Sequence, residues 1–259
     1  MPRYAANLTM LFGEVGFLDR FQAAARAGFS GVEYLFPYDY DARELRTRLE
    51  SHGLTQVLHN LPAGDWAAGE RGIACHPSRT AEFAAGVDRA LEYATALGCS
   101  QVNCLAGIVP PATSTEEARA TFVRNLQVAA PKLAAAGIRL LIEPINTRDI
   151  PGFFLNRTAQ ALEIIEAVGS GNLFLQYDVY HMQIMEGDLA TTLERRLPSI
   201  GHIQIADAPL RHEPGTGEIN YDFLLGHLDR LGYAGWVGLE YRPAGRTEEG
   251  LVWMKRLHT

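Results

Sequence analysis

The chain has 259 residues, of which 47% are hydrophobic, and it carries a formal net charge of −7. This size suffices for one large domain with a full core or for two small domains. The acidic balance argues against a nucleic-acid partner, because phosphate binding needs a basic surface. The first residues lack the apolar segment of a signal peptide, and no apolar run approaches the ~18 residues that span a bilayer. We therefore expect a soluble, cytoplasmic protein without a membrane partner.

Short apolar runs rich in β-branched and aromatic residues alternate with amphipathic segments along the chain. The runs predict eight strands, at residues 4–12, 31–38, 55–62, 101–107, 139–146, 173–181, 201–209 and 236–243. Apolar residues three and four apart predict helices at residues 17–27, 80–97, 115–136, 158–168, 221–231 and 247–257, and five of these end directly before a glycine. Residues 60–77 form a long predicted loop that could lie over a site.

Eight strand–helix units in about 250 residues are the number and size of a (β/α)8 TIM barrel. A doubly wound sheet is the competing architecture, but the chain lacks its glycine-rich dinucleotide turn. No Pro/Gly/Ser-rich linker divides the sequence. We predict a single α/β barrel domain over residues 1–259.

Two of the predicted strands run directly into glutamate, and two more carry an acid or an amide near their ends. These residues are Glu143, Asp178, Gln204 and Glu240. Active sites of such barrels lie at the carboxyl ends of the strands, so the four side chains can converge. Three carboxylates together would repel, and a divalent cation removes that cost. An all-oxygen set suits Mg²⁺, with Mn²⁺ as the alternative, whereas any one acid taken singly could merely cap a helix or pair with an arginine.

Four further residues are candidates for substrate contact. His181, three positions after Asp178, is placed to bond a substrate oxygen. His59 and Asn60 end the third predicted strand, and each has a structural alternative, a core histidine and a turn. The planar fork of Arg71 suits a substrate carboxylate, although a plain surface arginine is an equal interpretation.

Several other features are assigned no chemistry. The glycines of the segment "RHEPGTGEINY", residues 211–221, indicate a turn before a helix rather than a phosphate cradle. Asp149 and Asp207 lie near the site without a separate signal. The three cysteines, at positions 75, 99 and 104, fit small buried side chains. Neither lysine, at positions 132 and 255, ends an apolar strand, so Schiff-base chemistry is not expected.

Two opposed glutamates beside a metal suit proton transfer next to a carbonyl. The metal lowers the cost of an enediolate, one glutamate removes a C–H proton, and the other returns a proton to the neighbouring carbon. These residues therefore predict aldose–ketose isomerisation or epimerisation.

Several segments, in the same order along the chain, resemble those of the hydroxypyruvate isomerases. That family belongs to the xylose isomerase-like barrels, which also include ketose 3-epimerases and endonuclease IV. The most specific is "LHNLPAGDWAAGERGIAC" at residues 58–75, supported by "LLIEPINTRDIPGF", "QYDVYHMQIMEGDL" and "HEPGTGEINYDFL". The resemblance implies conversion of hydroxypyruvate to 2-hydroxy-3-oxopropanoate (tartronate semialdehyde), within glyoxylate metabolism. It also implies that Glu143 and Glu240 are the proton donor and acceptor, and that Glu143, Asp178, Gln204 and Glu240 bind the metal.

One departure and several alternatives accompany this interpretation. Sugar epimerases of the wider group have histidine at the Gln204 position and an arginine six residues later, where this chain has Leu210. That difference disfavours an epimerase. 2-Oxo-tetronate isomerase shares the carboxylate set and remains open, while an endonuclease IV-like phosphodiesterase and a non-catalytic binding barrel are disfavoured. A small 2-oxo acid is the expected partner, and the choice among monomer, homodimer and homotetramer is open.

Overall fold

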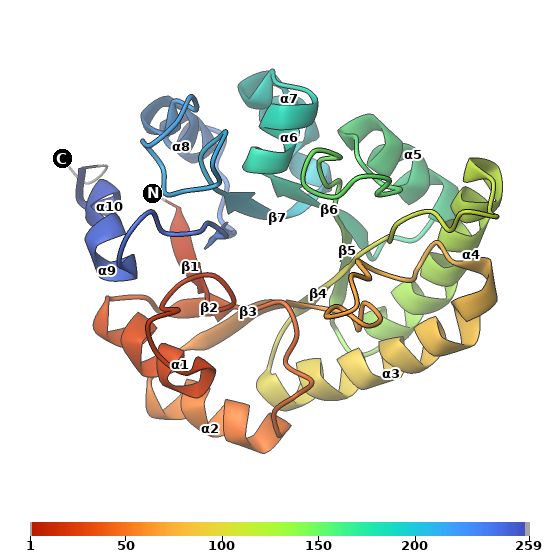
Figure 1. Cartoon of the computed structure of the whole chain (residues 1–259), viewed down its shortest axis with the longest axis horizontal. Coiled ribbons are helices and arrows are strands. Elements are labelled where there is room, and N and C mark those ends of the chain that lie inside the picture. The colour runs from red at the N-terminus through yellow and green to blue at the C-terminus, as the bar shows by residue number, and fades with distance from the viewer. Residues whose placement is uncertain (1, 257–259) are drawn as a thin grey trace.

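The computed structural model describes residues 2–256, and its eight parallel strands close into a barrel in chain order (Figure 1). The strands are β1 (Arg3–Asn7), β2 (Gly31–Glu33), β3 (Thr55–Asn60), β4 (Gln101–Cys104), β5 (Arg139–Ile142), β6 (Leu173–Asp178), β7 (Ile200–Ile205) and β8 (Trp236–Leu239). The last strand pairs with the first, so the sheet has no free edge. The predicted single-domain (β/α)8 barrel is thus confirmed.

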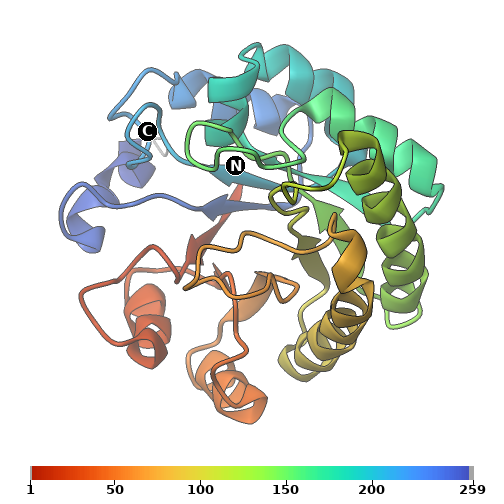
Figure 2. The ribbon, with the colours of Figure 1, turned by 45° about the vertical axis from the view of Figure 1, so that its right-hand side comes forward.

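Helices surround the strands and cover their outer side. They are α1 (Phe17–Arg26), α2 (Ala42–Ser51), α3 (Thr80–Leu97), α4 (Thr115–Ala134), α5 (Thr158–Val168), α6 (Val179–Met185), α7 (Leu189–Arg196), α8 (Tyr221–Arg230), α9 (Thr247–Gly250) and α10 (Val252–Arg256), with two 3-10 turns, η1 (Pro77–Arg79) and η2 (Leu197–Ser199). Figure 2 shows α3 to α5, in yellow to green, side by side outside the strands. No helix within residues 2–256 is long and apolar enough to cross a bilayer.

Local chemistry explains where the prediction of elements was right and where it was wrong. The predicted bounds of α3 and α5 are confirmed, because each helix ends at a glycine with a left-handed backbone, Gly98 and Gly169. The predicted strand at residues 173–181 ends early, at Asp178, whose carboxylate accepts a hydrogen bond from Tyr180 N and caps α6. His181 therefore lies on a helix. The last predicted helix divides into α9 and α10, and its predicted end at residue 257 lies outside the described residues.

Sequence patterns missed three helices. In α2 only two side chains, Leu45 and Leu49, are buried, so its apolar stripe is too narrow to stand out. Helices α6 and α7 are short, at seven and eight residues, and α6 directly follows a strand. Such short helices depend on tertiary packing more than on their own sequence.

The inside of the barrel has an apolar floor and a polar upper layer. Ala5, Val57, Leu58 and Leu141 form a separate buried cluster, while most apolar residues of the core lie between the strands and the helices. Because side chains alternate along a strand, the residues two positions beyond Ala5, Leu58 and Leu141 also point inward, toward the carboxyl ends. That upper layer holds the candidate site.

Candidate active site

Four predicted site residues reach one end of the barrel from neighbouring strands. Asp178 is paired with Gln204, and Gln204 with Gly238, so their inward positions lie side by side. Glu240 is two residues beyond Gly238 and takes the same face. Glu143 stands two residues beyond the inward-facing Leu141. All four side chains are buried.

Burial makes the ionised form of these acids costly. The pKa of Glu143 is raised well above its usual value by burial, and the nearby charges of Glu240 and Asp178 raise it further. Burial also raises the pKa of Glu240 to about 8 and raises that of Asp178, with Arg211 opposing both shifts. The pKa of Glu240 therefore lies near neutrality, where a proton can be taken up and released readily, and that of Glu143 is shifted in the same direction.

Arg211 is the cation of the site, and sequence reasoning missed it. Its Nη2 lies 3.0 Å from Glu240 Oε1 and 3.5 Å from Asp178 Oδ2, with only 13% of the side chain exposed. The available signal was an arginine in the loop after the seventh strand. The arginine stands one residue after the position compared with the sugar epimerases, which holds the exposed Leu210.

The loop that carries Arg211 is held by a buried aspartate. Asp207 accepts hydrogen bonds from the backbone N–H groups of Gly215, Gly217 and Ile219, at 2.8 to 3.1 Å. A Cβ at Gly217 would lie 1.9 Å from Ala208 O, so only glycine fits there. The glycines of this segment thus form a turn, as predicted, and that turn directs the arginine toward the acids.

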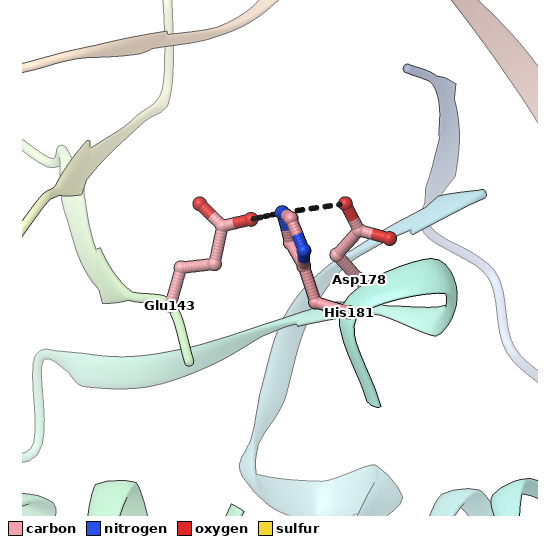
Figure 3. Close-up of side chains that lie close together, drawn as sticks. All are labelled: Glu143, Asp178 and His181. Carbon is pink, nitrogen blue, oxygen red and sulfur yellow. Dashed lines mark ion pairs between the residues drawn. The ribbon is translucent and has the colours of Figure 1, made fainter. Parts of the chain in front are cut away.

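His181 lies between two of the carboxylates, as Figure 3 shows. Its Nε2 is 3.5 Å from Asp178 Oδ2 and 4.0 Å from Glu143 Oε1. Burial lowers its pKa well below the usual value, and the charge of Arg211 lowers it further. The ring is therefore neutral at physiological pH.

Both amide atoms of Gln204 are hydrogen-bonded within a buried network that sequence reasoning missed. Its Oε1 accepts from Gln176 Nε2 at 2.6 Å, and its Nε2 donates to Glu33 Oε1 at 2.7 Å. Glu33 also contacts His202 Nε2 at 2.7 Å. A Cβ at Gly238 would lie 2.4 Å from the Glu33 carboxylate, so a glycine on β8 makes room for it.

Asn60 is connected to Glu143 by Asn103, a second residue that sequence reasoning missed. Asn103, on β4, donates from Nδ2 to Glu143 Oε2 at 2.9 Å and to Asn60 Oδ1 at 3.2 Å. Asn60 itself is buried, and its backbone oxygen accepts from Tyr38 at 2.6 Å. Asn103 therefore orients one oxygen of Glu143.

The structure does not bring His59 and Arg71 into the cluster. His59 is adjacent to the inward-facing Asn60 on β3, so its ring points outward, where it packs edge-on against Tyr38. Burial lowers its pKa to about 4. Arg71 lies over the ring of Trp66 and donates to the backbone oxygens of Trp66 and Glu70, so its guanidinium serves its own loop.

The loop at residues 60–77 lies on the same face of the barrel as the cluster. Residues 62–67 of this loop wall a cavity of about 720 Å³, together with the loops after β1 and β2. Phe36, Tyr38 and Trp66 line it. Glu143, Asp178 and Glu240 are not part of its lining, so this cavity is distinct from the cluster of acids.

The acids fit a divalent cation. Asp178 Oδ2 is buried without a hydrogen-bond partner among the described residues. When Glu143, Asp178 and Glu240 are ionised, the single guanidinium of Arg211 leaves two negative charges uncompensated. Ligand atoms of Glu143, Asp178 and His181 lie within 4.8 Å of one another, so this cluster could bind a metal ion. Arg211 Nη2 contacts both Asp178 Oδ2 and Glu240 Oε1, and so links Glu240 to that group.

Comparisons with known proteins give the chain's relationships. Residues 21–257 match the xylose isomerase-like TIM barrel family. The chain is 58% identical to hydroxypyruvate isomerase of Escherichia coli and 53% identical to 2-oxo-tetronate isomerase of Cupriavidus necator, each over 98% of both chains. A crystal structure of a Brucella melitensis protein described as an AP endonuclease of family 2 is 49% identical, with a TM-score of 0.96 over 99% of both chains.

A 3-keto-D-glucoside 4-epimerase of Escherichia coli shares the fold at 22% identity, with a TM-score of 0.80 over 99% of both chains. The curated relatives at high identity are isomerases, and this chain is an enzyme of that class. With its closed barrel and its match over residues 21–257, the chain belongs to the xylose isomerase-like TIM barrel family.

Proposed function

We propose that this enzyme interconverts hydroxypyruvate and 2-hydroxy-3-oxopropanoate by proton transfer through an enediolate. The observation that carries the proposal is the pair of buried glutamates, Glu143 and Glu240, whose pKa values are raised by burial. Identity of 58% to a hydroxypyruvate isomerase supports the substrate.

The proposed reaction removes a proton from one carbon and adds a proton to its neighbour. One glutamate removes a proton from C3 of hydroxypyruvate, and the electron pair of that C–H bond moves to form the enediolate. The other glutamate then delivers a proton to C2, and the proton of the C3 hydroxyl passes to the C2 oxygen as C3 becomes the aldehyde and C2 the alcohol. Raised pKa values suit both steps, because each group must gain and release a proton within one turnover.

Other side chains of the site have distinct proposed tasks. Arg211 binds the substrate carboxylate, since it is the guanidinium that reaches the acids. His181 donates a hydrogen bond to a substrate oxygen, and Asn103 orients Glu143. Asn60 lines the site behind Asn103. His59 and Arg71 keep structural positions and take no part in the proposed reaction.

A divalent ion, Mg²⁺ first and Mn²⁺ second, is the proposed cofactor. Glu143, Asp178 and Glu240 would hold it, with Gln204 at the edge of the set. When bound, the ion would stabilise negative charge on the substrate oxygens. Hard oxygen ligands favour these ions.

2-Oxo-tetronate is the second candidate substrate, because a relative at 53% identity is named for that activity. Its extra carbon leaves the proposed chemistry unchanged. A nuclease activity is disfavoured, since the one group of metal-ligand type found within residues 2–256 holds a single histidine and the chain is acidic.

The test compares kcat/KM for hydroxypyruvate and 2-oxo-tetronate, with and without a chelator, in wild type, Glu143→Gln and Glu240→Gln. The proposal expects preference for hydroxypyruvate and a loss of about a hundredfold or more in each variant. Preference for the longer acid would replace the substrate. Full turnover in either variant would remove that glutamate from its proposed role.

A further inference from the structure

Asn146, in the loop after β5, touches the ring of His181 on the side away from the carboxylates. Its Nδ2 lies 2.7 Å from His181 Nδ1 and 3.1 Å from Asp149 Oδ2. Its Oδ1 accepts a hydrogen bond from the backbone N–H of Asp149 at 2.7 Å. Asn146 and His181 are both buried, at 0% and 2% exposed.

These contacts permit one orientation of the amide. If Oδ1 and Nδ2 were exchanged, the amide NH₂ would face the N–H of Asp149, and the carbonyl oxygen would face the Asp149 carboxylate. Both contacts would be repulsive. The amide nitrogen therefore points at His181, where it can only donate.

The tautomer of His181 follows from this orientation. A neutral imidazole carries one proton, and the nitrogen that accepts from Asn146 cannot hold it. The proton is then on Nε2, which faces Asp178 Oδ2 at 3.5 Å and Glu143 Oε1 at 4.0 Å. Arg211 Nη2 lies 3.4 Å from Nε2, and a guanidinium can only donate, so a hydrogen bond there would require an unprotonated Nε2. The Asn146 contact with Nδ1, at 2.7 Å, is much shorter and decides the tautomer.

We propose that Asn146 is a positioning residue that keeps the proton of His181 on Nε2, which makes the ring a hydrogen-bond donor to substrate and prevents it from binding metal. A protonated nitrogen has no lone pair for a cation. Without this control, Glu143, Asp178 and His181 would form a mixed oxygen–nitrogen site, and imidazole suits Zn²⁺ better than Mg²⁺. The tautomer stands on geometry alone, whereas its role toward substrate rests on the proposed function.

The decisive variant exchanges the two side chains, Asn146→Asp together with Asp149→Asn. The net charge and the acid–amide pair are kept, but a carboxylate now faces Nδ1. Because a carboxylate can only accept a hydrogen bond, the ring proton must then be on Nδ1. Long-range ¹⁵N–¹H spectra distinguish a protonated ring nitrogen from a bare one, and a His181→Gln spectrum identifies the signals. We expect Nε2–H in wild type and Nδ1–H in the exchanged variant.

Metal titration gives a second readout that needs no turnover. In the exchanged variant the lone pair of Nε2 faces the acids and can bind a metal. The affinity for Zn²⁺, measured by calorimetry, should therefore rise about tenfold, the lower end of effects seen for groups that orient metal ligands. Asp149→Asn alone keeps the Asn146 donor and its backbone partner, so it should retain Nε2–H. Asn156→Asp, the same change elsewhere in this loop, should also leave the ring unaltered.

A bare Nε2 in wild type, or an unchanged tautomer in the exchanged variant, would overturn the proposal. Unchanged Zn²⁺ affinity after a confirmed exchange of tautomer would overturn its metal clause. If the exchanged variant does not fold, Asn146→Ala must give a mixture of tautomers, and a pure Nε2–H ring there would count against Asn146. Failure of wild type to turn over hydroxypyruvate with Nε2–H intact would reject the proposed function and leave the tautomer assignment standing.

Discussion

Replacing Glu240 by glutamine should change how the stability of the metal-free protein depends on pH. Burial raises the pKa of Glu240 from 4.5 to about 8. Between these values the carboxyl is protonated in the folded chain and ionised in the unfolded chain. The unfolded state then binds fewer protons, so wild-type stability falls as pH rises through this window.

The size of this effect follows from the window. Each pH unit inside it costs about 1.4 kcal/mol, and the slope diminishes near both ends. Between pH 5 and pH 8 the contribution of Glu240 to the free energy of unfolding should fall by about 3 to 4 kcal/mol. Glutamine has no such titration, and it still offers Arg211 an acceptor.

Urea denaturation at pH 5, 6, 7 and 8 with a chelator present measures this difference. The wild type should lose stability relative to Glu240→Gln by the stated amount, mostly between pH 5 and 8. Glu166→Gln, an exposed position on α5, is the control and should follow wild type. If wild type and Glu240→Gln change in parallel, the buried carboxyl carries no such cost and the reasoning fails.

Three further predictions test the surroundings of the acids. Arg211→Lys should raise KM for hydroxypyruvate about ten- to hundredfold with a smaller change in kcat, because lysine lacks the planar guanidinium. The control Arg195→Lys, on the exposed side of α7, should alter neither constant. A fall in kcat with unchanged KM would argue against binding of the substrate carboxylate by Arg211. Asp207→Asn removes a charged acceptor from four backbone N–H groups and should lower the free energy of unfolding by about 1 to 3 kcal/mol in urea denaturation. It should also raise KM by displacing Arg211, and an unchanged KM would show that this loop does not position the arginine. Mn²⁺ at a hundredfold excess over its Kd should stabilise wild type by about 2.7 kcal/mol and Asp178→Asn far less, and equal shifts would place the ion elsewhere.

The barrel was predictable because its signal repeats along the chain. Each apolar run has a strand's length, and five of the six amphipathic segments end directly before a glycine, which stops a helix. Gly98 and Gly169 show this, since a glycine after an apolar stripe marks a helix end in the sequence as in the structure. The end of β6 was mispredicted because Asp178 acts through its side chain as a cap, which an apolar pattern does not register.

The acids were predictable for a different reason. A carboxylate at the end of a buried strand is conspicuous, and the barrel places such ends together. Arg211 and Asn146 were not assigned their contacts, because both lie in loops whose course depends on particular turns. Arg211 reaches Glu240 only through a loop held by Asp207, and no spacing along the chain predicts that contact.

A single sequence also does not show which residues a buried acid contacts inside the barrel. Glu33 ends β2 and Glu143 directly follows β5, yet the carboxylate of Glu33 contacts Asn7, Gln204 and His202 in the layer beneath the site. A glycine on the neighbouring strand, Gly238, leaves the space for it. Whether a strand-end acid faces substrate or supports its neighbours therefore depends on its height in the barrel.

The most direct test of the proposed function is early turnover of hydroxypyruvate in deuterated buffer, followed by proton and deuterium NMR of the product. Proton transfer through Glu143 and Glu240 predicts deuterium at C2 of 2-hydroxy-3-oxopropanoate from the first turnovers. In Glu143→Gln, both the turnover and the deuterium incorporation should be lost. Product that forms at full rate with only hydrogen from C3 at its C2 position would contradict the proposed acid–base pair.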